Sequence, residues 1–175
     1  RRVGGLPLVL AGIPLHIVDL QEEFKHEVVD PFLEGYKKGL TPNPCIRCNR
    51  TIKFGKLLGL MKEFNCERLA TGHYARVARE RLPDGSERQL LLEAVDALKD
   101  QSYYLYGLTQ EQLSSVLFPL GAMQKSDVYA LAKRYDVPLD EYYRESQDLC
   151  FFPEKTPAEF LKRHLADAMQ PGEIV

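Results

Sequence analysis

The chain has 175 residues, 45% of them hydrophobic and 27% charged, and no apolar run approaches the length needed to span a bilayer. Four unevenly spread cysteines do not resemble a secreted disulfide framework, and the N-terminal stretch lacks a signal-peptide cleavage site, so we expect a reduced, cytoplasmic protein. The net charge of −2 leaves polyanionic partners open, because a polyanion needs only a local basic face.

The first third of the chain predicts a strand followed by helices. "PLHIVDL" (14–20) alternates like a strand, and apolar residues then recur at helical spacing. Pro31 should break or restart this helix, with Asp30 capping the new first turn, and Lys37 to Gly39 are typical of a helix end. "TPNP" (41–44) predicts an extended segment before the next helix begins.

The remainder of the chain indicates that strands and helices alternate. Residues 66–96 predict a strand, a turn at Gly72 and a hairpin closed by "LPDGSE". Three helices should follow, the first with a capping box at Thr109, the second over "KSDVYALAKRYDVP", and the third with a capping box at Thr156. This alternation predicts an α/β fold.

Cys45 and Cys48 lie in "TPNPCIRCN", on a predicted loop that leads into a helix whose macrodipole should favour both thiolates. A structural zinc site needs four ligands, and the chain has no second Cys-x-x-Cys. A thioredoxin-type redox pair normally follows a strand directly. The third alternative uses Cys150 in "ESQDLCFFPE", either as a thiol on a loop or as a buried residue that packs beside Phe151 and Phe152.

Several other residues have structural interpretations. Cys66, at a helix-to-strand junction, is expected to be a small buried hydrophobic residue. The tyrosines of "QSYYLY" and "EYYRES" could stack on RNA bases, but such spacing is more typical of core or rim residues. Three histidines, at positions 16, 26 and 164, show no ligand spacing with one another or with the cysteines.

Six segments occur in a characteristic order: "GLTPNPCIRCNRTIKFGKLL", "LATGHYAR", "LKDQSYYLYGL", "LFPLG", "KSDVYALA" and "ESQDLCFFPE". Together they resemble the tRNA-specific 2-thiouridylases of the PP-loop ATP pyrophosphatase superfamily over nearly the whole chain. The resemblance implies a partial Rossmann-like adenine-nucleotide α-hydrolase (PP-loop) domain over 1–120 and a small, mostly helical tRNA-binding segment with the second cysteine over 121–175. The family's phosphate-binding loop would precede residue 1 and its β-barrel would follow Val175, so we expect a fragment that is inactive alone.

The resemblance also implies a reaction. Family members use ATP with Mg²⁺ and a persulfide donor, a cysteine desulfurase or a relay protein, to replace the C2 oxygen of wobble uridine 34 of tRNA with sulfur, through an adenylated intermediate. Cys48 matches the family's nucleophile and Cys150 matches its persulfide carrier, with a transient disulfide between them. The alternatives are an iron–sulfur cluster on Cys45, Cys48 and Cys150, or a non-catalytic RNA-binding or zinc-stabilised module.

The remaining matched positions concern binding. Gly72 matches a glycine that contacts ATP, where the backbone can approach the nucleotide closely. Matches to tRNA-contacting residues are Asn43, Pro44 and Cys45, beside the target base, and His73, Lys99, Asp100 and Gln101. Taken one at a time, the residues at 73 and 99–101 could equally be solvated loop residues. Many relatives have an aspartate where this chain has Cys45. This chain therefore lacks a carboxylate at this position and any role that requires one.

Overall fold

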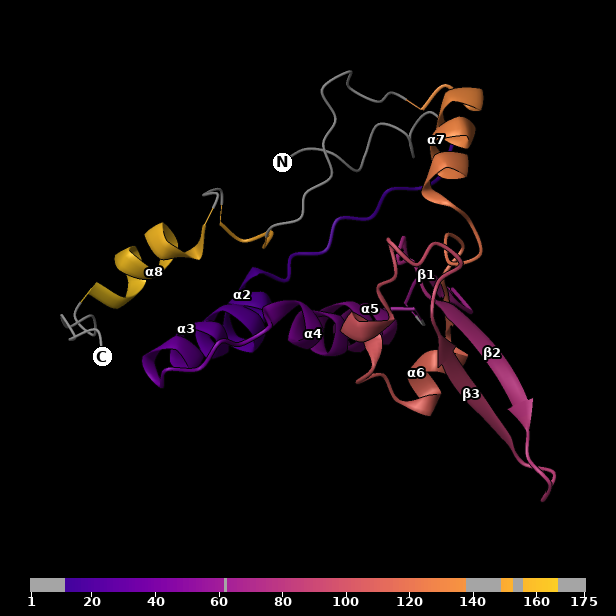
Figure 1. Ribbon diagram of the computed structural model, residues 1–175, viewed down its shortest axis with the longest axis horizontal. Helices are drawn as coiled ribbons and strands as arrows, with labels where there is room; N and C mark the ends of the chain where they lie inside the picture. Colours follow the sequence, from indigo (N-terminus) through magenta and orange to yellow (C-terminus); the bar gives the residue numbers. More distant parts are fainter. Residues whose placement is uncertain (1–11, 62, 138–148, 153–155, 167–175) are drawn as a thin grey trace. The chain divides into compact units, whose positions relative to one another are not determined.

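The computed structural model describes residues 12–61, 63–137, 149–152 and 156–166, which form helices and short strands (Figure 1). These residues divide into two compact units. The described part of the first unit comprises residues 12–20, Ala70–Ser102 and 117–137. That of the second comprises residues 21–61, 63–69, Tyr103–Val116, 149–152 and 156–166. The division expected at residue 120 stays a prediction.

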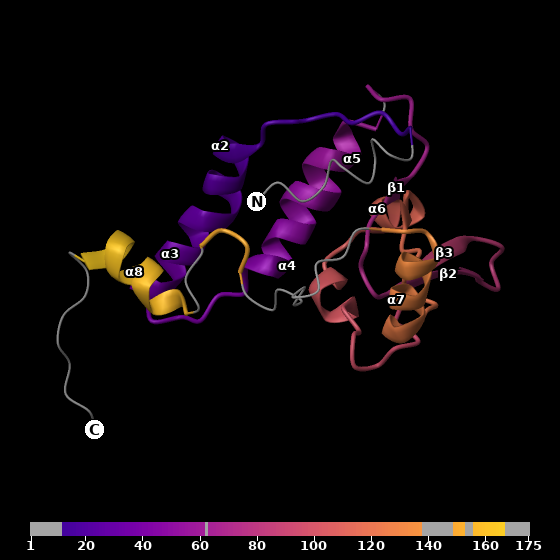
Figure 2. The same ribbon diagram turned by 90° about the horizontal axis from the view of Figure 1, so that it is seen from above.

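Two helical arms form most of the second unit. The first arm contains α2 (Gln21–Phe24), a π-helical segment (Lys25–Val29) and α3 (Asp30–Lys37). The second contains α4 (Pro44–Cys48), a π-helical segment (Asn49–Lys56) and α5 (Leu57–Gly59). The two arms run side by side in opposite directions (Figure 2). The unit also includes α6 (Gln110–Ser114) and α8 (Pro157–Leu165).

The first arm continues through Pro31, where the sequence predicted that the helix breaks or restarts. Proline has no backbone N–H, so the carbonyl of Glu27, four residues earlier, loses its usual helical partner. Arg47 of the second arm donates from Nε to this carbonyl and replaces the missing bond. Asp30 does not cap a helix, because its carboxylate accepts from Lys25 Nζ at 2.8 Å. The chain therefore does not break at Pro31, but α3 starts beside it with Pro31 in the first turn, as the restart alternative predicted.

The turn between the arms confirms the predicted helix end. Gly39 has a φ of 71°, in the left-handed region that glycine adopts readily, and Leu40 N donates to Gly35 O at 2.9 Å. A Cβ at Gly35 would lie 2.9 Å from Pro42 Cγ. The absence of a side chain at Gly35 therefore lets the "TPNP" segment pack directly on α3.

An aromatic core joins α8 to α3. Phe32, Phe152 and Phe160 are buried together, and the Phe152 and Phe160 rings stack with centroids 5.3 Å apart. Phe32 and Phe160 lie 6.3 Å apart between centroids, where α3 meets α8 (Figure 1). This core anchors the short segment 149–152 to the first arm.

The first unit contains the predicted hairpin, in which β2 (Arg76–Arg81) pairs antiparallel with β3 (Glu87–Leu92). Gly85 in its loop has a φ of 84°, as the predicted turn requires. By contrast, the strand predicted over 14–20 does not form, and Ile17 is 90% exposed. No described strand pairs with this segment, and an isolated strand leaves its backbone groups without partners.

A second strand pair joins β1 (Leu69–Ala70) to β4 (Val116–Leu117). Leu69 N donates to Ser115 O at 3.0 Å and Thr71 N donates to Leu117 O at 3.1 Å. The two bonds advance in the same direction along both segments, which is the parallel pattern. The strands are distant in sequence, so a crossover connects them, as in α/β folds.

Helix capping follows the sequence only in part. The capping box at Thr109 is confirmed, whereas the N-terminal Thr156 of α8 makes no side-chain capping bond. A residue outside helix α7 (Lys125–Arg134) caps it, because Asp96 Oδ2 accepts from Lys125 N at 2.9 Å.

None of the described helices has the length and apolar character that a membrane crossing demands.

Candidate active site

Cys45 and Cys48 lie inside the first turns of a helix, not on the loop that the sequence predicted. Asn43 is the N-cap, and its Oδ1 accepts from Cys45 N at 3.1 Å and from Ile46 N at 3.4 Å. Pro44 occupies the first helical position, where its missing N–H costs nothing. Because the cysteines are three residues apart, both thiols lie on one face of the helix. Both side chains are half-buried.

Cys150 belongs to the same unit and is exposed. The residues on either side, Leu149 and Phe151, pack against the aromatic core, and Phe152 is part of it. The buried-cysteine alternative is therefore wrong: the neighbouring residues are packed inward and leave the thiol accessible.

The pKa values of Cys45 and Cys48 depend on burial, on Lys53 and on Cys150. Burial raises the pKa of Cys45, a Cys150 thiolate raises it further, and Lys53 opposes both. Burial also raises the pKa of Cys48, against which Lys53 acts, while Cys150 and Cys45 add smaller increases. The expectation that the helix N-terminus favours both thiolates was wrong, because desolvation of the half-buried thiols outweighs it.

Cys66 is exposed, and its Sγ donates to Phe64 O at 3.4 Å, so the prediction of a buried residue was wrong. The chain turns at this point through Asn65, whose φ is 52°, and the cysteine stays at the surface. All four thiols are free, including the Cys48 and Cys150 pair. Within the described ranges, no three His, Cys, Asp or Glu residues are grouped so that they could hold a metal ion.

Asn49, directly after Cys48, is a site residue that sequence reasoning missed. Its side chain is buried, Nδ2 donates to Tyr104 O at 3.3 Å, and Oδ1 has no hydrogen-bond partner among the described residues. Gln112 Nε2 donates to Phe54 O at 2.7 Å and adds a second link. These bonds fasten the segment around Tyr104 to the cysteine-bearing helix. The adjacent "CN" letters in the sequence were the available signal.

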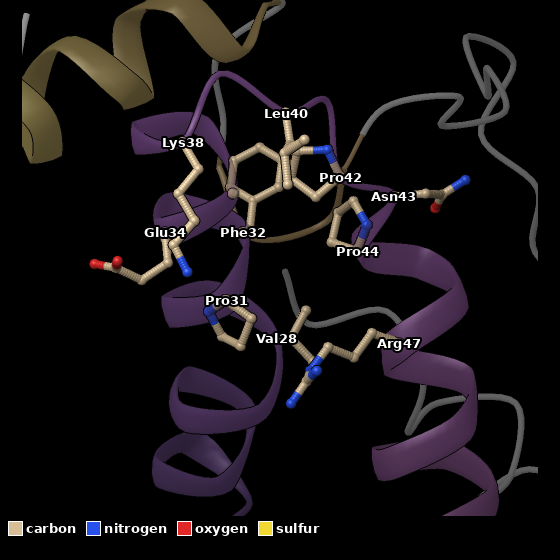
Figure 3. Close-up of a pocket in the computed structure, with 11 residues that line it drawn as sticks. Val28, Pro31, Phe32, Glu34, Lys38, Leu40, Pro42, Asn43, Pro44 and Arg47 are labelled. Carbon is tan, nitrogen blue, oxygen red and sulfur yellow. The ribbon is translucent and has the colours of Figure 1, made fainter.

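A cavity of about 350 Å³ lies between the two helical arms, next to Asn43 and Pro44 (Figure 3). Proline and aliphatic side chains form much of its wall, and Arg47 extends across one side toward the first arm. Arg47 Nη2 contacts Glu27 Oε2 at 3.2 Å, so its guanidinium is held in place. Two of the residues predicted to lie beside a target base, Asn43 and Pro44, therefore line an apolar hollow.

Gly72 and His73 follow β1 in the first unit. Gly72 is exposed at the carboxyl end of the strand, and a Cβ there would lie 3.8 Å from Leu120 Cδ1, an ordinary contact. The protein's own packing therefore does not require glycine at this position. His73 is 8% exposed, and its Nδ1 lies 2.8 Å from Thr71 Oγ1, so its ring braces the turn.

The segment predicted to touch tRNA, Lys99 to Gln101, has extensive internal bonding. Asp100 Oδ1 accepts from Ala94 N at 2.7 Å, and its Oδ2 accepts from Ser102 Oγ at 2.6 Å. Gln101 Oε1 accepts from Tyr74 N at 3.0 Å, while Gln101 N donates to Tyr74 O at 2.8 Å. Asp100 and Gln101 thus hold this loop against the residues after Gly72, a role that the sequence did not indicate.

A parallel strand pair with an exposed glycine at its carboxyl end, together with three interacting thiols, is typical of a nucleotide-binding α/β domain equipped for thiol chemistry. Residues 9–154 match the sequence model of the family described as tRNA methyl transferase HUP domain, and the chain belongs to this family. The predicted Rossmann-like α/β fold class is thereby confirmed.

Curated relatives give a more specific comparison. The chain is 46% identical over 164 residues to the tRNA-specific 2-thiouridylase MnmA of Methylobacterium radiotolerans, covering 94% of this chain and 41% of the relative. It is 45% identical over 165 residues to MnmA 1 of Caldanaerobacter subterraneus subsp. tengcongensis, covering 94% and 44%. MnmA of Leptospira interrogans serovar Lai is 42% identical over 151 residues, covering 86% and 39%. The chain thus spans about two fifths of these relatives' length.

Proposed function

We propose that this chain is part of a tRNA-uridine 2-sulfurtransferase, in which Cys150 carries the sulfur and Cys48 resolves the intermediate. The observation that carries the proposal is an exposed Cys150 in the same compact unit as two half-buried thiols on one helix face. The names of the curated relatives give the substrate class, tRNA, and the reaction, 2-thiolation. The accessibility of Cys150 and the partial burial of Cys48 support these two roles.

The proposed reaction transfers one sulfur atom from Cys150 to C2 of the wobble uridine. ATP adenylates the C2 oxygen of the wobble uridine and releases pyrophosphate. The terminal sulfur of a Cys150 persulfide attacks C2, and AMP departs with the original oxygen. The Cys48 thiolate then attacks Cys150 Sγ, forming the Cys48–Cys150 disulfide and releasing the 2-thiouridine. An external thiol reductant supplies two electrons that restore both thiols. A cysteine desulfurase or a persulfide relay protein reloads Cys150.

ATP, with its Mg²⁺, is a substrate of this reaction, and Gly72 is the described residue that we assign to it. Ligands of α/β folds bind beyond the carboxyl ends of parallel strands, and Gly72 occupies such an end. Its exposure and the lack of an internal packing reason for glycine support this assignment. Its backbone N–H is a donor for a phosphate or ribose oxygen.

We assign the target base to the neighbourhood of Asn43, Pro44 and Cys45, because the first two line the cavity beside the cysteine-bearing helix. A uridine removed from its loop would bring C2 to the thiols there. His73 and Lys99 to Gln101 are proposed as a second tRNA contact, in which the internal bonds of Asp100 and Gln101 present the loop backbone. The division at residue 120 and a cytoplasmic location complete the proposal.

The proposal is tested by assaying the complete protein with unmodified tRNA, ATP and a persulfide donor, and measuring wobble 2-thiouridine by mass spectrometry of digested tRNA. We expect 2-thiouridine only when both ATP and the donor are present, and none in tRNA whose wobble base is cytidine. Thiolation that proceeds without ATP, or absence of thiolation with every component present and tRNA bound, would contradict the proposal.

The iron–sulfur alternative is tested separately, with Cys45. The described residues do not supply a three-ligand group, so no step is assigned to a cluster. In the persulfide route Cys45 only neighbours the base, and Cys45→Ala and Cys45→Asp should keep at least about half of the parent's activity, whereas loss of a cluster ligand would abolish it. Iron-dependent visible absorption that disappears together with activity in Cys45→Ala would favour the cluster.

A further inference from the structure

A second hollow lies on the cysteine-bearing helix, on the side away from the Cys45 and Cys48 face. It has a volume of about 590 Å³ and is lined by Asn43, Ile46, Arg47, Arg50, Thr51 and Tyr106. Most of these positions recur at helical spacing of three or four residues, so they form one stripe. Two guanidinium groups line the hollow and none of its lining residues is acidic.

The Tyr106 ring forms one wall of the hollow and is open to solvent. Its side chain is 68% exposed, and that of Tyr103 is 63% exposed, with the two ring centroids 6.4 Å apart. Neither ring lies in the core, which leaves the rim and base-stacking interpretations for these two positions. The ring of Tyr106 is a large apolar surface held next to cations, which is a composition that suits a nucleobase.

Contacts within the protein hold the walls of the hollow in position. The Asn49 bond to Tyr104 O ties the tyrosine segment to the helix, and Arg50 Cδ lies 3.7 Å from the position that a Cβ would occupy at Gly107. The stem of Arg50 therefore passes close to the backbone next to Tyr106. A wall that is already positioned binds a ligand without first losing the entropy of ordering it.

The two arginines differ in availability. Arg47 donates hydrogen bonds to both the backbone carbonyl and the side-chain carboxylate of Glu27. Arg50 is exposed, and within the described part of the chain its guanidinium has no hydrogen-bond or ion-pair partner. Arg50 is thus the cation of the hollow that is ready for an external anion, and phosphate suits its geometry.

We propose that this hollow binds a nucleotide that flanks the thiolated uridine in single-stranded RNA, with the base stacked on Tyr106 and its phosphate bound by Arg50. The inference rests on the proposed function and names the part of the RNA that this helix recognises besides the target base. Cys45 and Cys48 lie on the same helix as most of the residues that line the hollow, so one RNA strand can place successive nucleotides at the hollow and at the thiols. A polyanionic single strand matches the two cations and the aromatic wall.

The test uses the complete protein and an anticodon-arm RNA hairpin with 2-aminopurine on either side of the wobble uridine. Stacking on Tyr106 should quench one of the two probes on binding. Tyr106→Ala should abolish that quenching and weaken hairpin binding about tenfold or more, whereas Tyr106→Phe should retain both. Arg50→Ala should weaken binding and lower the slope of log affinity against log salt by about one.

Matched controls are available on the same chain. Tyr135 is also 68% exposed, and Arg68 is an exposed arginine outside the hollow, so Tyr135→Ala and Arg68→Ala should bind the hairpin within about twofold of the parent. Quenching that persists in Tyr106→Ala, or that is lost equally in Tyr106→Phe, would overturn the inference. If the parent protein still thiolates tRNA in that case, the proposed function is unaffected. A parent that binds the hairpin but thiolates nothing would instead reject the proposed function.

Discussion

The reactivity of Cys45 and Cys48 depends on opposing effects on their pKa. Burial raises the pKa of each thiol above its ordinary value, and the positive charge of Lys53 acts in the other direction. Only the thiolate is nucleophilic, so the fraction of reactive sulfur at neutral pH is small and grows as pH increases toward the pKa. Lys53 therefore increases the thiolate fraction by lowering the pKa of its two neighbours.

We predict that Lys53→Met slows alkylation of Cys45 and Cys48 by iodoacetamide at neutral pH, because loss of the positive charge raises both pKa values further. Cys150→Ser should act in the opposite direction, since it removes a charge that raises them. Mass spectrometry of each modified peptide across a pH series measures these shifts. Lys56→Met, at an exposed position, is the control, and an unchanged pH profile in Lys53→Met would contradict the assignment.

At the scale of elements, the paired helical arms depend on one contact between them. Pro31 removes the donor that would bind the Glu27 carbonyl, and Arg47 supplies a donor from the second arm. A typical intramolecular hydrogen bond contributes about 0.5–1.5 kcal/mol net to stability. The contact therefore couples the positions of the arm that contacts α8 and the arm that carries Cys45 and Cys48.

We predict that Arg47→Met lowers the free energy of unfolding by about 0.5–1.5 kcal/mol. In a Pro31→Ala background the same change should have a smaller effect, because the introduced alanine donates its own backbone N–H to the Glu27 carbonyl. Denaturant unfolding of the four proteins gives the coupling directly. Arg50→Met is the control and should change stability by less than about 0.5 kcal/mol. Equal losses from Arg47→Met in both backgrounds would show that the contact is not a substitute for the helical bond.

The elements also show what sequence patterns can predict. Local chemistry was sufficient for the hairpin, the Thr109 capping box and the Gly39 helix end, because each depends on residues within a few positions. Features that depend on distant residues were missed, including the Arg47 bond to the Glu27 carbonyl and the Asp96 cap of α7. The cysteines were found as a group through resemblance, while the pKa shifts caused by their burial required coordinates.

Two glycines differ in the space available for a side chain, and substitutions there test how tightly the chain is packed. A Cβ at Gly121 would lie 1.6 Å from the backbone oxygen of the fully buried Ala75, whereas nothing lies within 4 Å of one at Gly59. We predict that Gly121→Ala destabilises the fold by about 3 kcal/mol or more, and that Gly59→Ala stabilises its helix by about 0.5–1 kcal/mol. Thermal unfolding measures both, and a Gly121→Ala variant as stable as the parent would contradict the close approach.

The central claim for the whole molecule is that sulfur passes through Cys150 and Cys48. The most direct measurement is single-turnover thiolation by the complete protein preloaded with persulfide, comparing the parent with Cys48→Ser, Cys150→Ser and, as the matched thiol control, Cys45→Ala. The account predicts wobble 2-thiouridine from the parent and from Cys45→Ala, and a loss of at least about 100-fold in both serine variants, with tRNA affinity within about threefold of the parent in all four. Thiolated tRNA at the parental rate from Cys48→Ser or Cys150→Ser would contradict it.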